Sequence, residues 1–319
     1  MKIKLVTPSP KGLLDGNRVT ARRWARLLRK LGHRPTVGNQ YDGDRCDLLI
    51  ALHAFKSFAS IRHFHEDHPD KPLIVALSGT DLYRDIHERD EVKGSLRLAT
   101  HLVVLQKHAR TELPESVRQK AHVIYQSAEP LKGNLAPPKS YFRVCVVGNL
   151  RPEKDPFRTA LASRRLAASS RIRIVHVGTA LRQEMKKRAL AENRRNRRYR
   201  WVGPLPYWRT QRLIASSHLV ALTSHMEGSS NVLSEALIGS IPVVASKIAG
   251  LVGTLGENYP GFFPTGDTQA LASLLERAET DSDFYRELKA ECARCRWLIQ
   301  PQREQRCWEK LLAEICSKR

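Results

Sequence analysis

Short apolar runs alternate with helical patterns along the first 130 residues. Strands are expected at residues 3–6, 47–52, 73–77, 102–105 and 123–125, and a helix at 18–31. In that helix Val19, Trp24 and Leu28 lie near one face, and Gly32 stands where a C-terminal cap belongs. Runs that are apolar at every position are typical of parallel strands buried on both faces. This half of the chain therefore predicts a doubly wound α/β domain.

The alternation stops at residues 131–140, which contain Gly133, Asn134 and two prolines but almost no apolar residues, as a linker does. It then restarts, with strands expected at 142–147, 172–177, 199–202, 219–222 and 241–245 and helices at 181–193 and 269–279. Apolar residues at 308, 311, 312 and 315 predict an amphipathic helix in the tail.

The pattern as a whole predicts an α/β protein built from two doubly wound, Rossmann-like domains facing a cleft. We expect an N-terminal acceptor-side domain at 1–138 and a C-terminal domain that binds the donor nucleotide at 139–300. The helix at 301–319 has an apolar face that could pack back toward the N-terminal domain.

The chain of 319 residues carries a formal charge of +22, which favours phosphate-bearing or other polyanionic partners. The one dense basic run, residues 194–200, follows a predicted helix, and a solvated helix end is the simpler interpretation. Nucleic-acid binding would call for a recognisable reader fold or aromatic platform as well. We therefore expect small-molecule substrates and no nucleic acid, with a basic binding module as the less favoured alternative.

Location and redox state follow from what the sequence lacks. No run approaches the ~20 apolar residues needed to cross a bilayer, and the N-terminus shows no signal-peptide hydrophobic region, so we expect a cytoplasmic protein with no membrane partner. Six scattered cysteines are expected to be reduced packing thiols.

Candidate chemistry follows the strand expected at 219–222. A loop of small residues leads there into a helix, and the free N–H groups of a helix start can bind a diphosphate without a metal. Donor contacts are expected from Gly228, Ser229, Ser230, Asn231 and Val232. Glu235 lies about one turn beyond Asn231, where its carboxylate can accept hydrogen bonds from a ribose. Glu227 lies in the loop, near the expected sugar.

Two glutamates separated by seven residues resemble the donor signature of retaining glycosyltransferases with the GT-B fold, in the large glycosyltransferase 4 group. The loop after the strand at 144–147 resembles the segment in which that family's arginine and lysine clamp the donor diphosphate. Lys154 matches the lysine, but Asn149 stands in the arginine position. Either Arg151 supplies the charge that the departing UDP requires, or the clamp is built differently. The resemblance implies catalytic roles for Arg151, Lys154 and Glu227, with Asn149 in the donor site.

Longer stretches resemble one narrower family, the selenosugar synthases of selenoneine biosynthesis. They lie at residues 16–21, 46–54, 78–83, 123–127, 150–157 and 256–264. The resemblance implies that selenophosphate attacks the anomeric carbon of UDP-N-acetylglucosamine or UDP-glucose. Release of UDP and phosphate then gives a 1-selenosugar, which makes the chain a hexosyltransferase that forms a C–Se bond. A selenophosphate synthase and a selenoneine synthase are the implied functional links.

The N-terminal half suits a small, highly charged acceptor. The helix start near residue 16 is a candidate anion site, and several polar residues follow the predicted strands on the same edge of the sheet. Acceptor contacts are expected from Gly16, Asn17, Arg18, Thr20, His53, Thr80, Asp81 and Lys107. For His53, a structural histidine in the core or loop is an equal alternative.

No metal or other cofactor is expected. Asp42 with Asp44, and Asp281 with Asp283, imitate an Asp-x-Asp metal motif, but neither pair directly follows a convincing strand. The cysteines and the histidines at 63, 65 and 68 also lack a convincing zinc spacing. An ordinary GT-B glycosyltransferase with a hydroxyl acceptor remains the alternative function. The choice of UDP-sugar, the stereochemical outcome and the oligomeric state stay open.

Overall fold

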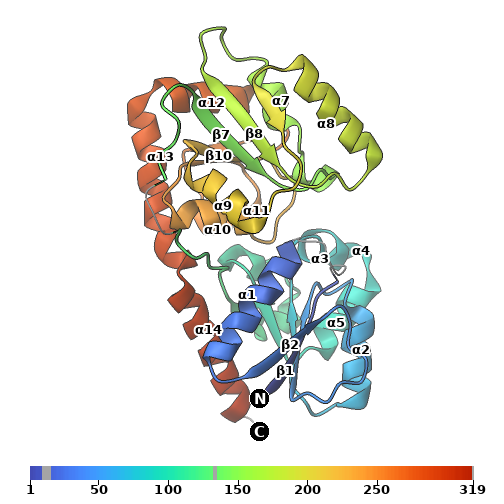
Figure 1. Cartoon of the computed structure of the whole chain (residues 1–319). Coiled ribbons are helices and arrows are strands. Elements are labelled where there is room, and N and C mark those ends of the chain that lie inside the picture. Colours follow the sequence, from blue (N-terminus) through green and yellow to red (C-terminus); the bar gives the residue numbers. More distant parts are fainter. Residues whose placement is uncertain (9–15, 132–134, 318–319) are drawn as a thin grey trace. The chain divides into compact units, whose positions relative to one another are not determined.

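The computed structural model describes residues 1–8, 16–131 and 135–317, and contains two six-stranded parallel sheets in two compact units (Figure 1). Residues 1–127, 227–231 and 301–319 form the first unit, and residues 128–226 and 232–300 form the second. The predicted pair of doubly wound α/β domains is confirmed. The expected linker includes residues 132–134, which lie outside the described residues. The boundaries at 138 and 300 remain predictions of where the chain divides into independently folding parts.

The first sheet has the strand order β2-β1-β3-β4-β5-β6, and all neighbours are parallel. Its strands are β1 (Lys2–Val6), β2 (Arg34–Gly38), β3 (Leu48–Leu52), β4 (Leu73–Ala76), β5 (His101–Val104) and β6 (Ala121–Val123). Only β2 was not expected, because this edge strand is largely polar and partly exposed. The strand order reverses between β1 and β3, so ligands are expected beyond the carboxyl ends of these two strands.

Helices cover both faces of the first sheet. One face packs against α1 (Gly16–Lys30) and α14 (Pro301–Ser317), and the other against α2 (Phe58–Asp67) and α5 (Asp90–Leu98). The indole rings of Trp24 and Trp308 meet edge to face at 4.8 Å between centroids, and Figure 1 shows α1 and α14 on the same side of the sheet. Shorter helices complete the unit: α3 (Thr80–Tyr83), α4 (Asp85–Glu88), α6 (Glu115–Arg118) and η1 (Lys107–Arg110).

The tail helix α14 is held on the first unit by a buried carboxylate. Glu304 is 1 % exposed and accepts hydrogen bonds from Arg23 Nε at 3.0 Å, Trp24 Nε1 at 2.7 Å and the Ser127 amide at 2.9 Å. A buried charge persists only when such partners satisfy it. The apolar spacing of the tail thus produces a docked helix whose orientation is fixed by one acidic residue.

The second sheet has the strand order β12-β11-β10-β7-β8-β9, again entirely parallel. Its strands are β7 (Phe142–Val147), β8 (Ile172–Val177), β9 (Tyr199–Trp201), β10 (Leu219–Leu222), β11 (Val243–Ser246) and β12 (Phe262–Phe263). This is the Rossmann order, which reverses between β7 and β10. The loops after β7 and β10 are therefore the expected ligand loops of this unit.

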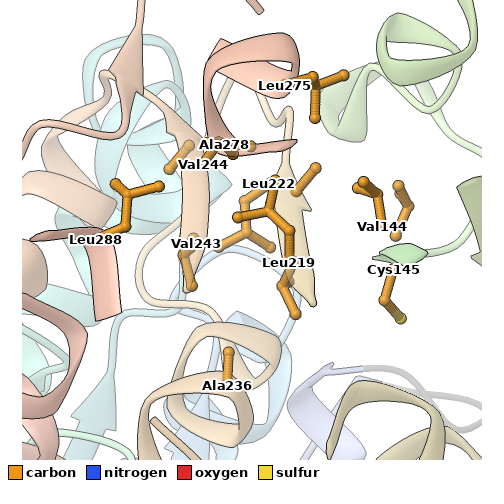
Figure 2. Packing of buried hydrophobic residues seen from close by; sticks show 14 of the residues in the cluster. Val144, Cys145, Leu219, Leu222, Ala236, Val243, Val244, Leu275, Ala278 and Leu288 are labelled. Atoms are coloured by element: carbon orange, nitrogen blue, oxygen red, sulfur yellow. The ribbon is translucent and has the colours of Figure 1, made fainter. Parts of the chain in front are cut away.

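Helices also sandwich the second sheet. Figure 2 shows Ala236 of α10 (Asn231–Ile238) on one side of the strands and Leu275 and Ala278 of α12 (Thr268–Thr280) on the other. The remaining helices are η2 (Pro152–Lys154), α7 (Arg158–Ser163), α8 (Gln183–Arg195), α9 (Tyr207–Ala215), α11 (Ala249–Leu255), α13 (Ser282–Cys295) and η3 (Arg296–Ile299). Among the described residues, no helix combines the length and the apolar character that crossing a bilayer requires.

The residues that imitate metal motifs have structural partners. Asp281 caps α13 by accepting hydrogen bonds from the amides of Asp283 and Phe284, at 3.0 and 2.9 Å. Asp42 and Asp44 both pair with the Lys4 ammonium group. All six cysteines are free.

Candidate functional site

The two ligand loops of the second unit are hydrogen-bonded to each other. After β10, the Thr223 hydroxyl lies 3.0 Å from the carbonyl oxygen of Lys154 and 2.9 Å from that of Asp155. The His225 amide donates to the Glu153 carbonyl at 2.9 Å. Two segments selected separately from the sequence thus meet where the strand order of the sheet reverses.

The turn that follows β7 is fixed from the side of β8. The Asn149 side-chain oxygen accepts a hydrogen bond from the Thr179 amide at 3.0 Å. Gly178 has a φ of 157°, and a Cβ there would lie 1.9 Å from the Gly148 carbonyl oxygen, so only glycine fits. The Asn149 carboxamide therefore has a structural task that an arginine at this position would not perform in the same way. Its contact with the donor stays a prediction.

The side chain of His176, on β8, also holds the turn after β7 in place. Its Nε2 lies 3.1 Å from the Gly148 carbonyl oxygen, which can only accept, so Nε2 carries the proton and Nδ1 accepts from the Tyr199 hydroxyl at 2.8 Å. Burial lowers the pKa of His176 to about 4. At neutral pH this residue is thus an uncharged link between β8, β9 and the β7 loop.

Basic side chains are displayed on this supported turn. Arg151 is exposed and extended just before η2, and Lys154, at the end of η2, is half-buried with its aliphatic stem beside Gly148. Asp155, in a left-handed conformation with φ of 41°, pairs with Arg158 Nε at 2.6 Å. His225 Nε2 lies 3.7 Å from the Asp155 carboxylate. Such an edge can receive a diphosphate, and the catalytic roles of Arg151 and Lys154 stay predictions.

The predicted donor segment is divided between the units. Val232 and Glu235, both half-buried on α10, belong to the second unit, whereas residues 227–231 group with the first. Glu227, Gly228 and Ser230 are buried, and Ser229 is half-buried. The catalytic role of Glu227 and the donor contacts of this segment stay predictions.

Within the first unit, the backbone of Gly228 lies against the loop that follows β4. A Cβ at Gly228 would lie 2.5 Å from the Ser78 carbonyl oxygen, and one at Gly79 would lie 3.1 Å from the Gly228 amide nitrogen. Gly79 also has a φ of 151°, a conformation that favours glycine. The segment at 227–231 is therefore next to the loop that leads into Thr80 and Asp81.

Asn231 meets the start of α1 in the same unit. Its side-chain nitrogen donates to the Gly16 carbonyl at 3.3 Å and to the Thr20 hydroxyl at 3.4 Å, and its oxygen accepts from Arg23 Nη1 at 2.7 Å. Gln126 Nε2 also donates to Thr20, at 2.7 Å. Asn231, which the sequence predicts to bind the donor, is thus in contact with Gly16 and Thr20, which it predicts to bind the acceptor. Arg23 and Gln126 escaped sequence reasoning because no motif marks them.

His53, Thr80 and Asp81 come together beyond β3 and β4. His53 has a φ of 74°, unusual for a residue other than glycine, and its side chain is 4 % exposed. Its Nδ1 accepts from the Lys56 amide at 3.4 Å, so Nε2 carries the proton and donates to Thr80 Oγ1 at 3.0 Å. The Thr80 hydroxyl keeps its own proton available as a donor.

Asp81 holds these loops together. Its carboxylate is fully buried; Oδ1 accepts from the amides of Ser78 and Gly79, at 2.9 and 2.8 Å, and Oδ2 accepts from the Ala54 amide at 2.9 Å. The loop after β3 is thereby joined to the loop after β4. The direct acceptor contact expected of Asp81 stays a prediction, whereas its positioning role follows from these three hydrogen bonds.

The remaining acceptor candidates occupy the same edge of the first sheet. Arg18 is buried and donates from Nη2 to Asn39 Oδ1 at 2.6 Å. Asn17 is half-buried near the start of α1, and Lys107 is exposed at the start of η1, beyond β5. Gly16 and Asn17 adjoin residues 9–15, which are not among the described residues.

The basic run at 194–200 is partly engaged by its own unit. The buried Glu192 carboxylate pairs with Arg195 Nη2 at 2.7 Å and with the guanidinium of Arg164. Arg198 Nη2 donates to the Ala167 carbonyl at 2.6 Å. These contacts agree with the interpretation of the run as a helix end.

Comparison with known families identifies the chain. Residues 127–294, more than half of the sequence, match the family described as Glycosyl transferases group 1, so the chain belongs to this family and is a glycosyltransferase. A search of curated proteins by sequence found no match.

Solved structures agree on the fold. Anabaena HepE in complex with UDP and glucose is 17% identical, with a TM-score of 0.74, over 98% of this chain and 100% of that one. Sucrose-phosphate synthase from Thermosynechococcus elongatus is 15% identical, with a TM-score of 0.78, over 100% of both chains. An E. coli structure titled trehalose-6-phosphate, bound with UDP-2-fluoro glucose, is 12% identical, with a TM-score of 0.75, over 99% of both chains. The fold is that of the GT-B glycosyltransferases.

Proposed function

We propose that this glycosyltransferase moves a hexose from a UDP-hexose to selenophosphate, as the resemblance to selenosugar synthases implies. Selenium forms a bond to the anomeric carbon while the bond from that carbon to the UDP oxygen breaks, and UDP leaves with the electron pair. Water then cleaves the P–Se bond, which releases phosphate and leaves a 1-selenosugar. UDP-glucose and UDP-N-acetylglucosamine are both candidate donors.

Two observations support a UDP-sugar donor. Two proteins with a similar fold have such ligands bound: Anabaena HepE is in complex with UDP and glucose, and the E. coli structure is bound with UDP-2-fluoro glucose. In this chain the loops after β7 and β10 are hydrogen-bonded to each other. The first of them carries Arg151 and Lys154, and His225 of the second lies 3.7 Å from Asp155 of the first. Fixed cations can stabilise the charge that builds on UDP as it departs, so the donor step needs no bound metal.

The observation that carries the acceptor assignment is the meeting of His53, Thr80 and Asp81. They come from two of the stretches that resemble selenosugar synthases and lie within hydrogen-bond reach of one another or of shared backbone. Because His53 donates to Thr80, the Thr80 hydroxyl can in turn donate to an anion. Hydrogen-bond donors of this kind suit selenophosphate, because selenophosphate attacks as an anion. An alcohol acceptor would instead need a base to remove its proton.

The physiological setting completes the proposal. We expect the reaction in the cytoplasm, downstream of a selenophosphate synthase and upstream of a selenoneine synthase. The ordinary glycosyltransferase with a hydroxyl acceptor is the competing function, since family membership is equally consistent with it.

The test combines the protein with selenophosphate and each UDP-sugar in the presence of a chelator, with products identified by mass. We expect a 1-selenosugar, UDP and phosphate in equal amounts. Simple sugars and alcohols offered instead of selenophosphate serve as the control. UDP-sugar turnover with a hydroxyl acceptor, and none with selenophosphate, would establish the competing function.

Thr80→Val refines the test, because valine keeps the shape of threonine and removes the hydroxyl donor. We expect kcat/KM for selenophosphate to fall roughly 10-fold, the cost of about one hydrogen bond to an anion, with UDP binding unchanged. Ser216→Ala, on α9's C-cap in the second unit, is the matched loss of a hydroxyl elsewhere. Unchanged kinetics in Thr80→Val would remove this residue from the acceptor site.

A further inference from the structure

A group of metal-ligating side chains lies in the first unit, apart from the residues assigned to transfer. His101 of β5, His122 of β6 and Glu314 of α14 each offer one ligand atom, and these atoms all lie within 4.8 Å of one another. We propose that the three residues form a Zn²⁺ site that joins α14 to the edge of the first sheet. This proposal does not depend on which donor and acceptor the enzyme uses.

The topology of the unit brings the three residues together. β5 and β6 are parallel neighbours, and their register pairs Val103 with His122. His101 lies two residues before Val103, so both histidines project from the same face of the sheet. Val103 belongs to the core that α14 completes with Leu311 and Ile315. Glu314, beside Ile315, therefore borders the same face.

The ring of His101 is oriented by its neighbour Thr100. The Thr100 hydroxyl donates its single proton to the Leu73 carbonyl at 3.0 Å, and its oxygen lies 2.9 Å from His101 Nδ1. That contact is a hydrogen bond only if Nδ1 carries a proton, and in this tautomer Nε2 is the ring atom that can bind a metal. Metal-binding histidines are commonly oriented in this manner, by a hydrogen bond from the other ring nitrogen.

The separations are wider than those around a bound ion but of the same order. His122 Nε2 lies 3.9 Å from Glu314 Oε2, and the two imidazole centroids are 5.6 Å apart. Ligand atoms around tetrahedral Zn²⁺ lie about 3.3 Å apart, because each bond is about 2.0–2.1 Å long. The side chains of His122 and Glu314 are 28 % and 37 % exposed, and the ligand atoms would have to move closer together around an ion.

The ligand set selects the metal and its task. Two imidazoles and one carboxylate suit Zn²⁺, with water as the fourth ligand, whereas Mg²⁺ prefers oxygen ligands alone. His101 is the first residue of β5, whereas Lys107 and the acceptor loops follow the carboxyl ends of their strands. The ion therefore fastens α14 to β5 and β6 and takes no part in sugar transfer.

Titration of the full, chelator-stripped chain tests the proposal. Zn²⁺ alone is added in a calorimeter, and Co²⁺ alone is followed by its visible absorption, which becomes intense in a four-coordinate site. We expect one equivalent of each ion, no comparable binding of Mg²⁺, and a Zn²⁺-dependent rise in thermal stability. A wild-type chain that binds no stoichiometric Zn²⁺ would overturn the proposal.

Substitutions assign the ligands. His101→Gln, His122→Gln and Glu314→Gln should each weaken Zn²⁺ binding by on the order of 100-fold or more, since loss of an outer hydrogen bond alone costs about 10–100-fold. Matched controls are the exposed His87→Gln on α4 and Glu309→Gln on α14, which should bind as the wild type does.

Two further checks keep the result decisive. Glu314 is only half-buried, so Glu314→Gln should fold even if a histidine variant does not, and circular dichroism of each metal-free variant verifies this. Cys316→Ser removes the exposed thiol nearest in sequence to Glu314 and should leave binding intact. Full-strength binding in all three ligand variants, or its loss in Cys316→Ser alone, would place the ion elsewhere and contradict the proposal.

Discussion

The loops that follow the strands at the carboxyl ends of the two sheets are built differently. In the first unit, the loops after β3 and β4 are tied by the buried Asp81 carboxylate, which accepts three backbone amides. In the second unit, the loops after β7 and β10 are joined through backbone carbonyls, with neutral side chains beneath them. The first unit thus has a buried charge, Asp81, that holds its loops together. The second unit has charged side chains, such as Arg151, on the surface of its loops.

This difference is consistent with the two tasks that we propose for the units. A small acceptor requires a few donors held in fixed positions, and a buried charge hydrogen-bonded to backbone supplies that rigidity. A donor diphosphate requires cations that can reach it, and Arg151 is exposed while Lys154 is half-buried. The following substitutions remove the support of one unit at a time, or remove one displayed cation.

Removal of the buried charge should have the largest effect. Asp81→Ala leaves three amides without their acceptor, and we expect a loss of about 3–5 kcal/mol in stability of the first unit. Asp81→Asn, which keeps one oxygen, should lose less. Hydrogen exchange in β3 and β4 measures the change, and the exposed Asp90→Asn is the control. Native-like exchange in Asp81→Ala would show that this carboxylate does not hold the loops.

The corresponding support in the second unit is steric. Gly178→Ala puts a Cβ 1.9 Å from the Gly148 carbonyl oxygen, so the backbone must shift, and we expect a cost of at least about 3 kcal/mol in β7 and β8. Gly256→Ala is the control, because Gly256 also has a positive φ, 94°, but open space around it. Its cost should be smaller, about 1–3 kcal/mol, because only backbone strain contributes there. Hydrogen exchange measures the loss of stability in both variants. An equal loss in Gly178→Ala and Gly256→Ala would show that the close approach to Gly148 does not contribute to it.

Arg151→Ala tests the displayed charge. We expect kcat for sugar transfer to fall about 100-fold with a smaller change in donor affinity, because a preorganised cation acts mainly in the transition state. Arg182→Ala, an exposed arginine of the same unit, is the control. Asn149→Arg should not raise activity, because it removes the acceptor of the Thr179 amide. Near-normal turnover of a folded Arg151→Ala enzyme would place the clamp on other residues.

His176 makes the support of the second unit sensitive to acid. Its pKa is about 4 when folded and about 6.5 when unfolded, so the unfolded chain binds more protons between these values. Stability is complete above pH 6.5 and should fall by about 2 kcal/mol at pH 5. His176→Gln can keep both hydrogen bonds without titrating, so its stability should fall less. Urea titrations of both proteins at pH 7.5 and 5 compare them; identical pH dependence would exclude His176 as the cause.

The fold was predictable from the sequence because buried parallel strands are apolar at every position and their loops contain small polar residues. The runs at 219–222 and 142–147 located both ligand loops of the second unit in this way. By contrast, the edge strand β2 and the two-residue strand β12 were missed because neither carries such a run of apolar residues.

Side-chain partnerships were beyond the sequence. Asp81, Asn149 and Glu304 act on backbone or side chains that no spacing rule connects to them. The three residues of the proposed zinc site are likewise far apart in the chain, and the strand register together with the docking of α14 brings them together. Local pattern therefore predicted the strands and the loops that follow them, whereas the supporting contacts depend on tertiary structure.

The central claim is that the loops after β7 and β10 receive the donor diphosphate. Hydrogen exchange with and without UDP, in a chelator, tests it directly. We predict slower exchange at residues 148–155 and 223–235 and no change at the basic run 194–200. Absence of protection at 148–155 and 223–235, or protection that appears only when Mg²⁺ or Mn²⁺ is added, would contradict the account.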